Sequence, residues 1–553
     1  MSVMRALPGS SRYSDGTRLA WIPSFIFTMA MSSQPRTKGK KMSTLMKALN
    51  GSAVTEKGGL QYMTSGSRCL DFFEMAGSAR KAKKGANGMS NDDMRRKMEL
   101  ALAEDRETAI RILLWAYDCR GGAGSRDIMR AALPYFILKE DQDTVLRMLR
   151  AIPELGRYDM LTDLLENDDL PVVYTKQVLN IIKDTLIGVV PEGGTEPVPS
   201  PMAPLCAKWL PRKGKAANRV RGWLHQTPAE YRHMRSKYVT TEALMSARKW
   251  AEIKYEQVPS VCFARSRNAF KTHDLQRFTK FTEKAVKGEV KVNAGVVYPH
   301  DVVRDLMQHC SMWSWHHSAR PDRTLIQAAE AQWRNLPDLF DGKTTSVFPI
   351  IDVSGSMTTQ VSGNISAIHV AVALGLYCAE HQRGKFRNEA MCFSGRPVAV
   401  ELKGDIWERL MTLLNTQDEC TTDLGLCIET LVKTAKRNRI PQEDMPDNLL
   451  ILSDLQFDYT AHDGRGVTAT EFIKRQFTDA GYKVPVIIYW NLAARTTNGV
   501  PATIDKDGVI MVSGFSQSIL KAVLEGAELA QKCQPAYIMM TAVYKDRYDL
   551  SKY

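Results

Sequence analysis

The sequence predicts an α + α/β protein in which an irregular array of helices precedes a doubly wound, mostly parallel α/β domain. Up to about residue 341, apolar residues recur at helical spacing and no strand pattern interrupts them. After residue 342, short apolar runs alternate with helical patterns, as in a parallel sheet covered by helices. A chain of 553 residues also exceeds the size of a single hydrophobic core, so two or three domains are expected.

Composition divides the chain into three segments. Residues 1–58 are predicted to be a flexible basic extension, because residues 32–58 are rich in Ser, Lys, Gly and Thr and show little apolar periodicity. An apolar stretch within it is interrupted by Pro23 and is too short to span a bilayer, so no membrane association is expected. Residues 59–341 are predicted to form the helical module and residues 342–553 the α/β domain.

The helical module opens with a long periodic run. Apolar side chains from Met94 to Tyr117 stand near helical spacing, so one helix is expected over residues 92–118, before a glycine-rich turn. Five prolines between residues 191 and 204 exclude a helix and predict an exposed loop. Further helices are expected at residues 126–139, 142–151, 157–165, 171–188, 204–210, 228–234, 240–255, 273–287, 300–310 and 323–335.

The α/β domain is inferred from five short apolar runs bounded by turn residues, a pattern typical of buried parallel strands. The five runs lie at residues 346–351, 389–393, 449–453, 484–490 and 509–512. Helical patterns separate or follow them at residues 364–383, 405–415, 423–437, 468–480 and 516–533. This order predicts a doubly wound sheet with helices on both faces.

The positive charge of the chain belongs to its N-terminal segments. Lys and Arg number 74 against 61 Asp and Glu, a net charge of +13. Residues 342–553 hold 22 basic and 24 acidic residues, which leaves 52 and 37 for residues 1–341, so the two parts carry −2 and +15. Basic side chains bind nucleic acids by neutralising phosphates, so the excess indicates a polyanionic partner; a merely soluble basic surface is the alternative.

One basic segment, residues 208–238, also contains aromatic side chains. Trp209, Trp223, Tyr231 and Tyr238 would stack on unpaired bases while the cations hold phosphates. The alternative is that the aromatic residues belong to the helix core and the charges to a solvated face, and the pattern does not choose between them. The candidate RNA-binding residues are Lys208, Arg212, Lys213, Lys215, Arg219, Arg221, Arg232, Arg235 and Lys237.

Oxygen-bearing side chains follow two predicted strands and open one predicted helix. Asp352, Ser354 and Ser356 come after the first strand, Asp454 ends the third, and Thr422 precedes a helix. Ligands of an open α/β sheet gather beyond the carboxyl ends of its strands, where these three loops meet. Because hard cations take oxygen ligands, the five residues are predicted to bind a divalent cation, Mg²⁺ in the first place, with Mn²⁺ or Ca²⁺ as alternatives.

The run DVSGS at residues 352–356 resembles the metal-ion-dependent adhesion site (MIDAS) of von Willebrand factor A domains, whose signature is Asp-x-Ser-x-Ser. By that resemblance Thr422 is the ligand from the second loop, and Asp454 acts directly or through water. The same resemblance implies an incomplete shell whose open position binds an acidic side chain of a protein partner.

Several phrases of the helical module, taken together and in order, resemble an uncharacterised Ro-like (TROVE-like) family known from plants and viruses. That family is similar in organisation to the Ro autoantigens, in which HEAT-like helical repeats and a von Willebrand A domain accompany binding of structured or misfolded RNA. The resemblance implies an RNA partner and no catalysis. The phrases are DCRGGAGSR (118–126), ELGRYD (154–159), AKWLPR (207–212), VPS (258–260) and YPHD (298–301).

No pattern of an enzyme accompanies these features. The chain has neither a Gly-x-Ser-x-Gly elbow nor the Gly-Lys-Ser/Thr ending of a phosphate-binding loop. Its ten cysteines are scattered singly, which fits reduced thiols and a cytoplasmic location. The sequence therefore predicts a Ro-like RNA-binding scaffold with a MIDAS, and the alternative is a metal-dependent protein-interaction adaptor without an RNA role.

Overall fold

The chain forms two compact units. The described part of the small unit is Arg157–Tyr238, and the sheet unit comprises Lys40–Gly156 and Val239–Tyr553. The structure, a computed structural model, describes residues 52–55, 60–77, 91–139, 141–191, 193–238, 240–308, 318–342, 346–362, 364–382, 385–393, 395–416, 422–457, 467–493, 499–514, 516, 519–521, 523–524 and 534–553.

The small unit is helical. Helix α7 contacts α8, α8 contacts α9 and α10, and α9 contacts α11. The proline-rich loop carries one antiparallel bridge, between Val189 and Val198, before α9 begins. The helices are α7 (Asp159–Leu164), α8 (Val172–Leu186), α9 (Ala203–Trp209), α10 (Lys215–Trp223) and α11 (Pro228–Lys237).

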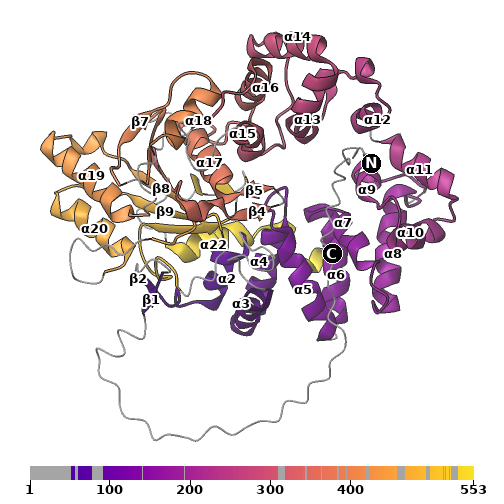
Figure 1. Cartoon of the computed structure of the whole chain (residues 1–553). Coiled ribbons are helices and arrows are strands. Elements are labelled where there is room, and N and C mark those ends of the chain that lie inside the picture. The colour runs from indigo at the N-terminus through magenta and orange to yellow at the C-terminus, as the bar shows by residue number, and fades with distance from the viewer. Residues whose placement is uncertain are drawn as a thin grey trace, which may run out of the picture. The chain divides into compact units, whose positions relative to one another are not determined.

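A six-stranded sheet is the centre of the sheet unit (Figure 1). Its strand order is β10-β9-β8-β3-β6-β7, and only β7 runs antiparallel to its neighbour. The interior strands β3, β8 and β9 are buried along their whole length, as expected where helices cover both faces. The strands are β3 (Val347–Ile351), β6 (Glu389–Cys392), β7 (Ala399–Glu401), β8 (Asn448–Ser453), β9 (Val486–Asn491) and β10 (Val509–Ser513).

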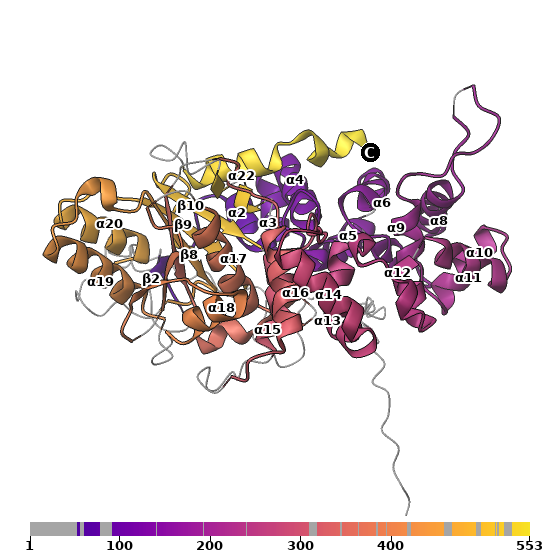
Figure 2. The same ribbon diagram turned by 90° about the horizontal axis from the view of Figure 1, so that it is seen from above.

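Helices between the strands pack on this sheet. α17 lies against β3, and Gly375 allows the close approach because a Cβ there would overlap the side chain of Ile351. α19 and α20 lie side by side, as Figures 1 and 2 show. The parallel crossovers from β3 to β6 and from β8 to β9 contain α17 and α20, which therefore start on the side of the sheet where β3 and β8 end. The helices are α17 (Ala367–His381), α18 (Ile406–Leu414), α19 (Leu424–Arg437), α20 (Ala469–Asp479) and α22 (Pro535–Val543).

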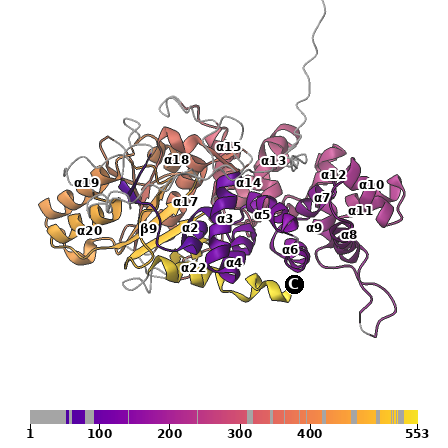
Figure 3. The same cartoon turned by 90° about the horizontal axis from the view of Figure 1, so that it is seen from below.

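The residues before the small unit join the same core. A hairpin of β1 and β2 is followed by α2, which contacts β10, and by α4, which contacts α22 (Figure 3). Segments from the two ends of the chain thus pack together beside the last strand. The elements are β1 (Ser52–Val54), β2 (Leu60–Tyr62), α2 (Arg68–Ala76), α3 (Asn91–Glu104), α4 (Arg106–Tyr117), α5 (Arg126–Leu138) and α6 (Gln142–Leu155).

A second helical group follows the small unit in sequence. Phe263, Phe270 and Phe278 form its core with Tyr255, and α15 and α16 connect it to α17 and α18. The short elements β4 (Gln360–Ser362) and β5 (Ile365–Ser366) form a hairpin before α17. The helices of this group are α12 (Thr240–Ser246), α13 (Ser260–His273), α14 (Leu275–Val286), α15 (Pro299–Met307) and α16 (Arg323–Arg334), with 3-10 turns at Trp250–Glu252 and Tyr255–Gln257. Elsewhere in the sheet unit, 3-10 turns lie at Gly355–Thr358, Gln442–Asp444, Asp546–Tyr548 and Leu550–Lys552.

The predicted α + α/β class is confirmed at the level of a helical N-terminal part and a C-terminal, mostly parallel sheet. All five expected strands are present, with bounds that differ by no more than two residues. The compact units do not coincide with the predicted segments, because α2 to α6 and α12 to α16 belong to the sheet unit. A separate module at 59–341 stays a prediction.

Some expected helices differ in detail. The prediction of a single helix over residues 92–118 was wrong. Asp105 leaves the helical conformation, and its side chain accepts the Thr108 amide (3.1 Å), so that a second helix, α4, starts after it. Helices α2, α10, α13 and α22, the hairpins β1–β2 and β4–β5 and the edge strand β7 were not expected. The expectation that no strand precedes residue 341 was therefore wrong, because β1 and β2 pair there. Most of residues 1–58 and of the helix expected at 516–533 lie outside the described residues. No helix of the described residues is long and apolar enough to cross a membrane.

Candidate metal centre

Asp352 and Asp454 lie at the carboxyl end of the sheet, on neighbouring strands. β3 and β8 pair in parallel with Ile351 opposite Leu452, so each carboxylate follows its strand at nearly the same level. The Asp352 amide donates to the carbonyl of Leu452 (2.9 Å), which fixes the first residue after β3 against β8. Both Asp side chains are fully buried. These two loops therefore lie side by side, as predicted.

Hydroxyl groups surround the Asp352 carboxylate. Its Oδ1 accepts the Ser354 amide (3.0 Å), and its Oδ2 accepts the hydroxyl of Ser453 (2.7 Å). The Oγ atoms of Ser354 and Ser356 are 3.0 Å apart. Asp352, Ser354 and Ser356 thus present oxygen atoms within one turn, as the Asp-x-Ser-x-Ser spacing predicted.

The position of Thr422 is set by α19, the helix that it precedes. Thr422 is fully buried and stands before Asp423, which caps α19 by accepting the Leu426 amide (2.8 Å). Cys427 in the first turn of α19 lies 4.0 Å from the carbonyl of Cys392, the last residue of β6. Because β6 adjoins β3, the start of α19 lies beside the strand that carries Asp352. Direct participation of Thr422 stays a prediction.

The two carboxylates interact electrostatically. Burial and, next, the charge of Asp454 raise the pKa of Asp352 to about 6, against the opposing effect of hydrogen bonds from Ser453 and Ser354. Two buried carboxylates that repel each other are unfavourable unless one is protonated or a cation lies between them. The arrangement therefore suits a positive charge at this position.

The donor set fits a hard cation better than a transition metal. Within the described residues no group of three His, Cys, Asp or Glu side chains could hold a metal ion. Asp352 and Asp454 instead combine with serine and threonine hydroxyls, which are the oxygen ligands that Mg²⁺ accepts while it keeps some of its waters. The residues present thus fit the predicted divalent cation.

Comparisons with known proteins cover both halves of the chain. Residues 346–548, which include the candidate metal centre, match a family described as a domain of unknown function (DUF7788). Residues 202–342, which include the whole basic and aromatic segment, match another domain of unknown function (DUF2828). The chain is also 26% identical over 521 residues to "Uncharacterized protein L728" of Acanthamoeba polyphaga mimivirus, covering 86% of this chain and 85% of that protein.

Two residues at the centre were not among the predicted ones. Ser453, fully buried, donates to Asp352 and also accepts the amide of Leu455 (3.0 Å). Its position at a strand end, just before Asp454, was the sequence feature that could have indicated a role at this site. Gln61 of β2 donates its Nε2 to the carbonyl of Leu455 (2.9 Å), and no local sequence pattern indicates this contact.

The predicted RNA-binding residues lie on α9 to α11 of the small unit, and some serve the fold. Arg219 donates to the carbonyls of Leu165 and Asn167, both at 2.8 Å, and pairs with Asp168 at 3.1 Å. Lys215 also pairs with Asp168. Arg235 donates to the carbonyl of Leu210 (3.0 Å), and burial lowers its pKa. These cations hold loops together whether or not RNA binds.

The remaining candidates are more accessible. Arg221 is half-buried, and the exposed candidates are Lys208, Arg212, Lys213, Arg232 and Lys237. Among the aromatic residues, Tyr231 is buried and donates to the carbonyl of Pro211 (3.0 Å), so it belongs to the core. Trp209 stacks under Arg157, whose guanidinium carbon lies 3.4 Å from the ring centre. The alternative of core aromatic residues thus applies to part of the segment.

Proposed function

We propose that this chain is a non-catalytic binding scaffold whose sheet unit is a von Willebrand A-type domain with a divalent cation at a MIDAS. The observation that carries the proposal is the pair of buried, mutually repelling carboxylates, Asp352 and Asp454, beside the serine hydroxyls. A cation would relieve the repulsion and keep a coordination position for an acidic group of a partner.

Direct binding of Mn²⁺ to the full chain tests the metal assignment. Isothermal titration of the chelator-treated protein should show one site, with Mg²⁺ competing for it. Because the ligands must be ionised, binding should release protons when Asp352 is protonated in the free protein. Absence of saturable Mn²⁺ binding would remove the basis of the proposal.

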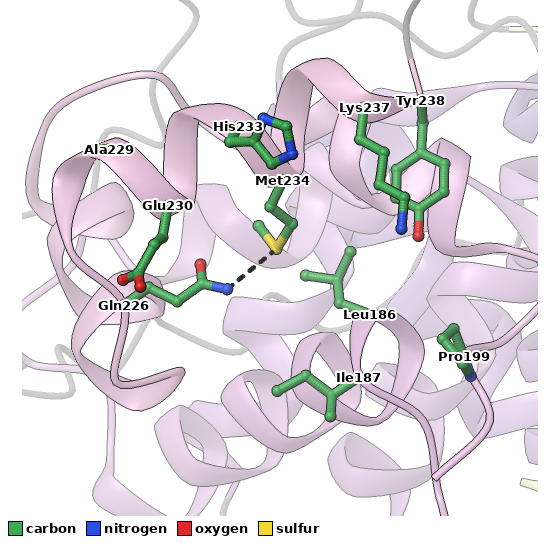
Figure 4. A pocket seen from close by; sticks show the side chains of 10 residues that line it. All are labelled: Leu186, Ile187, Pro199, Gln226, Ala229, Glu230, His233, Met234, Lys237 and Tyr238. Atoms are coloured by element: carbon green, nitrogen blue, oxygen red, sulfur yellow. Dashed lines mark hydrogen bonds between the residues drawn. The ribbon is translucent and has the colours of Figure 1, made fainter.

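RNA is the proposed partner of the small unit, as in the Ro-like resemblance. The support is the exposed set Lys208, Arg212, Lys213, Arg232 and Lys237 on α9 to α11 and the loop between α9 and α10. Lys237 also lines a shallow cavity of about 620 Å³. In Figure 4, Tyr238 stands beside Lys237 at one side of this cavity, while Leu186, Ile187 and Met234 form its apolar lining. A cation next to an aromatic ring suits an unpaired nucleotide, because the cation contacts the phosphate and the base stacks on the ring.

Charge reversal of the exposed cations should weaken RNA binding. We expect the triple variant Arg212→Glu, Lys213→Glu, Arg232→Glu to lose at least tenfold in affinity for a structured RNA. The salt slope should fall as well, because each lost phosphate contact releases one counterion fewer. Filter binding across a salt series, with melting temperatures of both proteins, measures the effect. Unchanged affinity and slope would place any RNA contact elsewhere.

Arg219→Glu is the matched control. This substitution reverses one charge, as each substitution of the triple variant does, but it removes the three hydrogen bonds to the loop at Leu165 to Asp168. Two partly buried carbonyls would lose this donor, so the variant should melt at a lower temperature. Its effect on RNA affinity, measured below that temperature, should be smaller than that of the single reversal Arg232→Glu at an exposed position.

A further inference from the structure

The residue after Asp454 has an unusual backbone conformation. Leu455 has φ +60° and is almost completely buried. A branched side chain rarely adopts the left-handed region, and it stays there only when its surroundings hold it. Such residues gather at functional sites, where the strained turn directs a neighbouring side chain. Here the neighbour is a predicted metal ligand.

Hydrogen bonds from both sides hold this turn. The Leu455 amide donates to Ser453 Oγ (3.0 Å), and the Gln456 amide donates to Asp454 Oδ1 (3.3 Å). The Leu455 carbonyl accepts Gln61 Nε2 (2.9 Å). Ser453 donates in turn to Asp352 Oδ2 (2.7 Å). A continuous series of hydrogen bonds therefore leads from Gln61 through the turn to both carboxylates.

Gln61 is itself firmly placed. It is 3% exposed, at the buried middle position of β2, between Leu60 and Tyr62. Tyr62 exchanges two backbone hydrogen bonds with Val500, its amide donating at 3.0 Å and its carbonyl accepting at 2.7 Å. This bridge fixes β2 against the segment after β9. A buried amide with a fixed backbone can hold the carbonyl it contacts in one position.

We propose that Gln61 is a positioning residue of the metal centre, which acts through the strained turn at Leu455 to direct Asp454 toward the cation. This proposal rests on the metal site proposed above. Partners of metal ligands typically change affinity by roughly 10-fold to 100-fold when they are removed. The predicted centre thus depends on a residue nearly four hundred positions upstream, outside the matched domain at 346–548.

Gln61→Met tests the proposal in the full chain, because Met keeps the length of the side chain but cannot donate. We expect Mn²⁺ to bind about tenfold more weakly, at the lower end of that range. Exchange of the Leu455 and Gln456 amides in the metal-free protein should become faster, because the turn opens more often. Adding Leu455→Gly should restore most of the affinity, because glycine takes a positive φ without strain.

Thr55→Val is the matched control on the same hairpin. Thr55 donates to the carbonyl of Phe457 (2.6 Å), so its loss also loosens the hairpin but leaves Leu455 held. We expect at most a threefold change in Mn²⁺ affinity, a small fraction of the Gln61→Met effect. Equal effects of the two variants, or wild-type affinity in Gln61→Met, would overturn the positioning role.

Amide exchange separates this proposal from the proposed function. If the wild type binds no Mn²⁺, the metal assignment fails, and faster exchange at Leu455 in Gln61→Met would still show that Gln61 holds the turn without serving a cation. That result would overturn the positioning of a metal ligand. If the wild type binds Mn²⁺ and neither affinity nor exchange changes in Gln61→Met, the metal assignment stands and only the role of Gln61 is wrong.

Discussion

Asp352→Ala should abolish the stabilisation of the sheet unit by Mg²⁺. At a Mg²⁺ concentration of 100 times the dissociation constant, we expect the wild type to gain about 2.7 kcal/mol. Without cation, the variant should melt near the wild type, because the lost hydrogen bonds from Ser453 and Ser354 are offset by relief of the repulsion from Asp454. Scanning calorimetry with and without Mg²⁺ measures both effects.

Asp405→Ala provides the matched control for this experiment. Asp405 caps α18 by accepting the Glu408 amide (3.0 Å) and lies outside the predicted ligand set. Loss of a helix cap costs about 1 kcal/mol, so this variant should melt earlier yet keep the full response to Mg²⁺. If Asp352→Ala also kept the response, or the wild type had none, the Asp-x-Ser-x-Ser run would be a structural turn.

The sequence was sufficient to predict where the strands end and hence where Asp352 and Asp454 lie. Buried parallel strands are short apolar runs, and their carboxyl ends share one edge, so two local patterns locate two side chains in space. The positions of Ser354 and Ser356 follow from the same prediction, because both residues belong to the turn after β3. What the sequence could not indicate was the contribution of β2, because the hydrogen bond from Gln61 joins residues 394 positions apart.

The basic segment shows a different limit of sequence patterns. Charge and spacing do not distinguish Arg232, which is exposed, from Arg219, whose guanidinium is occupied by two carbonyls and Asp168. Whether one of these cations is exposed or occupied depends on which loop lies beside its helix in the folded chain, and a sequence pattern does not contain that tertiary contact.

The helix break at Asp105 could in principle have been predicted from the sequence, because Asp is a common N-cap residue and Asp105 stands three residues before Thr108 within the long periodic run.

A buried carboxyl beside β9 and β10 gives the sheet unit a pH dependence of its own. Glu74 of α2 is 3% exposed, and burial raises its pKa to about 7. The charge of Asp71 adds to the rise, while Lys97 and a hydrogen bond with Asn491 oppose it. α2 is held there because the Gly77 amide donates to Ser513 Oγ (3.0 Å). Glu74 therefore cannot simply turn toward solvent when it ionises.

A carboxyl whose pKa is raised in the folded state stabilises the fold only while it is protonated. The contribution of Glu74 is complete below about pH 4.5, its ordinary pKa, and is lost as the pH rises through about 7. The loss amounts to roughly 3 kcal/mol, since each pKa unit corresponds to about 1.4 kcal/mol. Stability should thus fall between about pH 4.5 and pH 7 and stay level above that range.

Glu74→Gln should remove this fall, because the amide stays neutral at every pH. We expect the variant to match the wild type near pH 5 and to melt at a higher temperature at pH 8, with the difference growing between pH 5 and 7. Melting curves in chelator across this range measure the difference. Glu471→Gln is the control: burial works against ionisation of Glu471, but hydrogen bonds from Tyr62 and Thr468 hold its pKa below the usual range, so its effect should be constant above pH 5. Parallel pH profiles of the wild type and Glu74→Gln would contradict the prediction, because they would show that Glu74 ionises with the same pKa in the folded and unfolded chains.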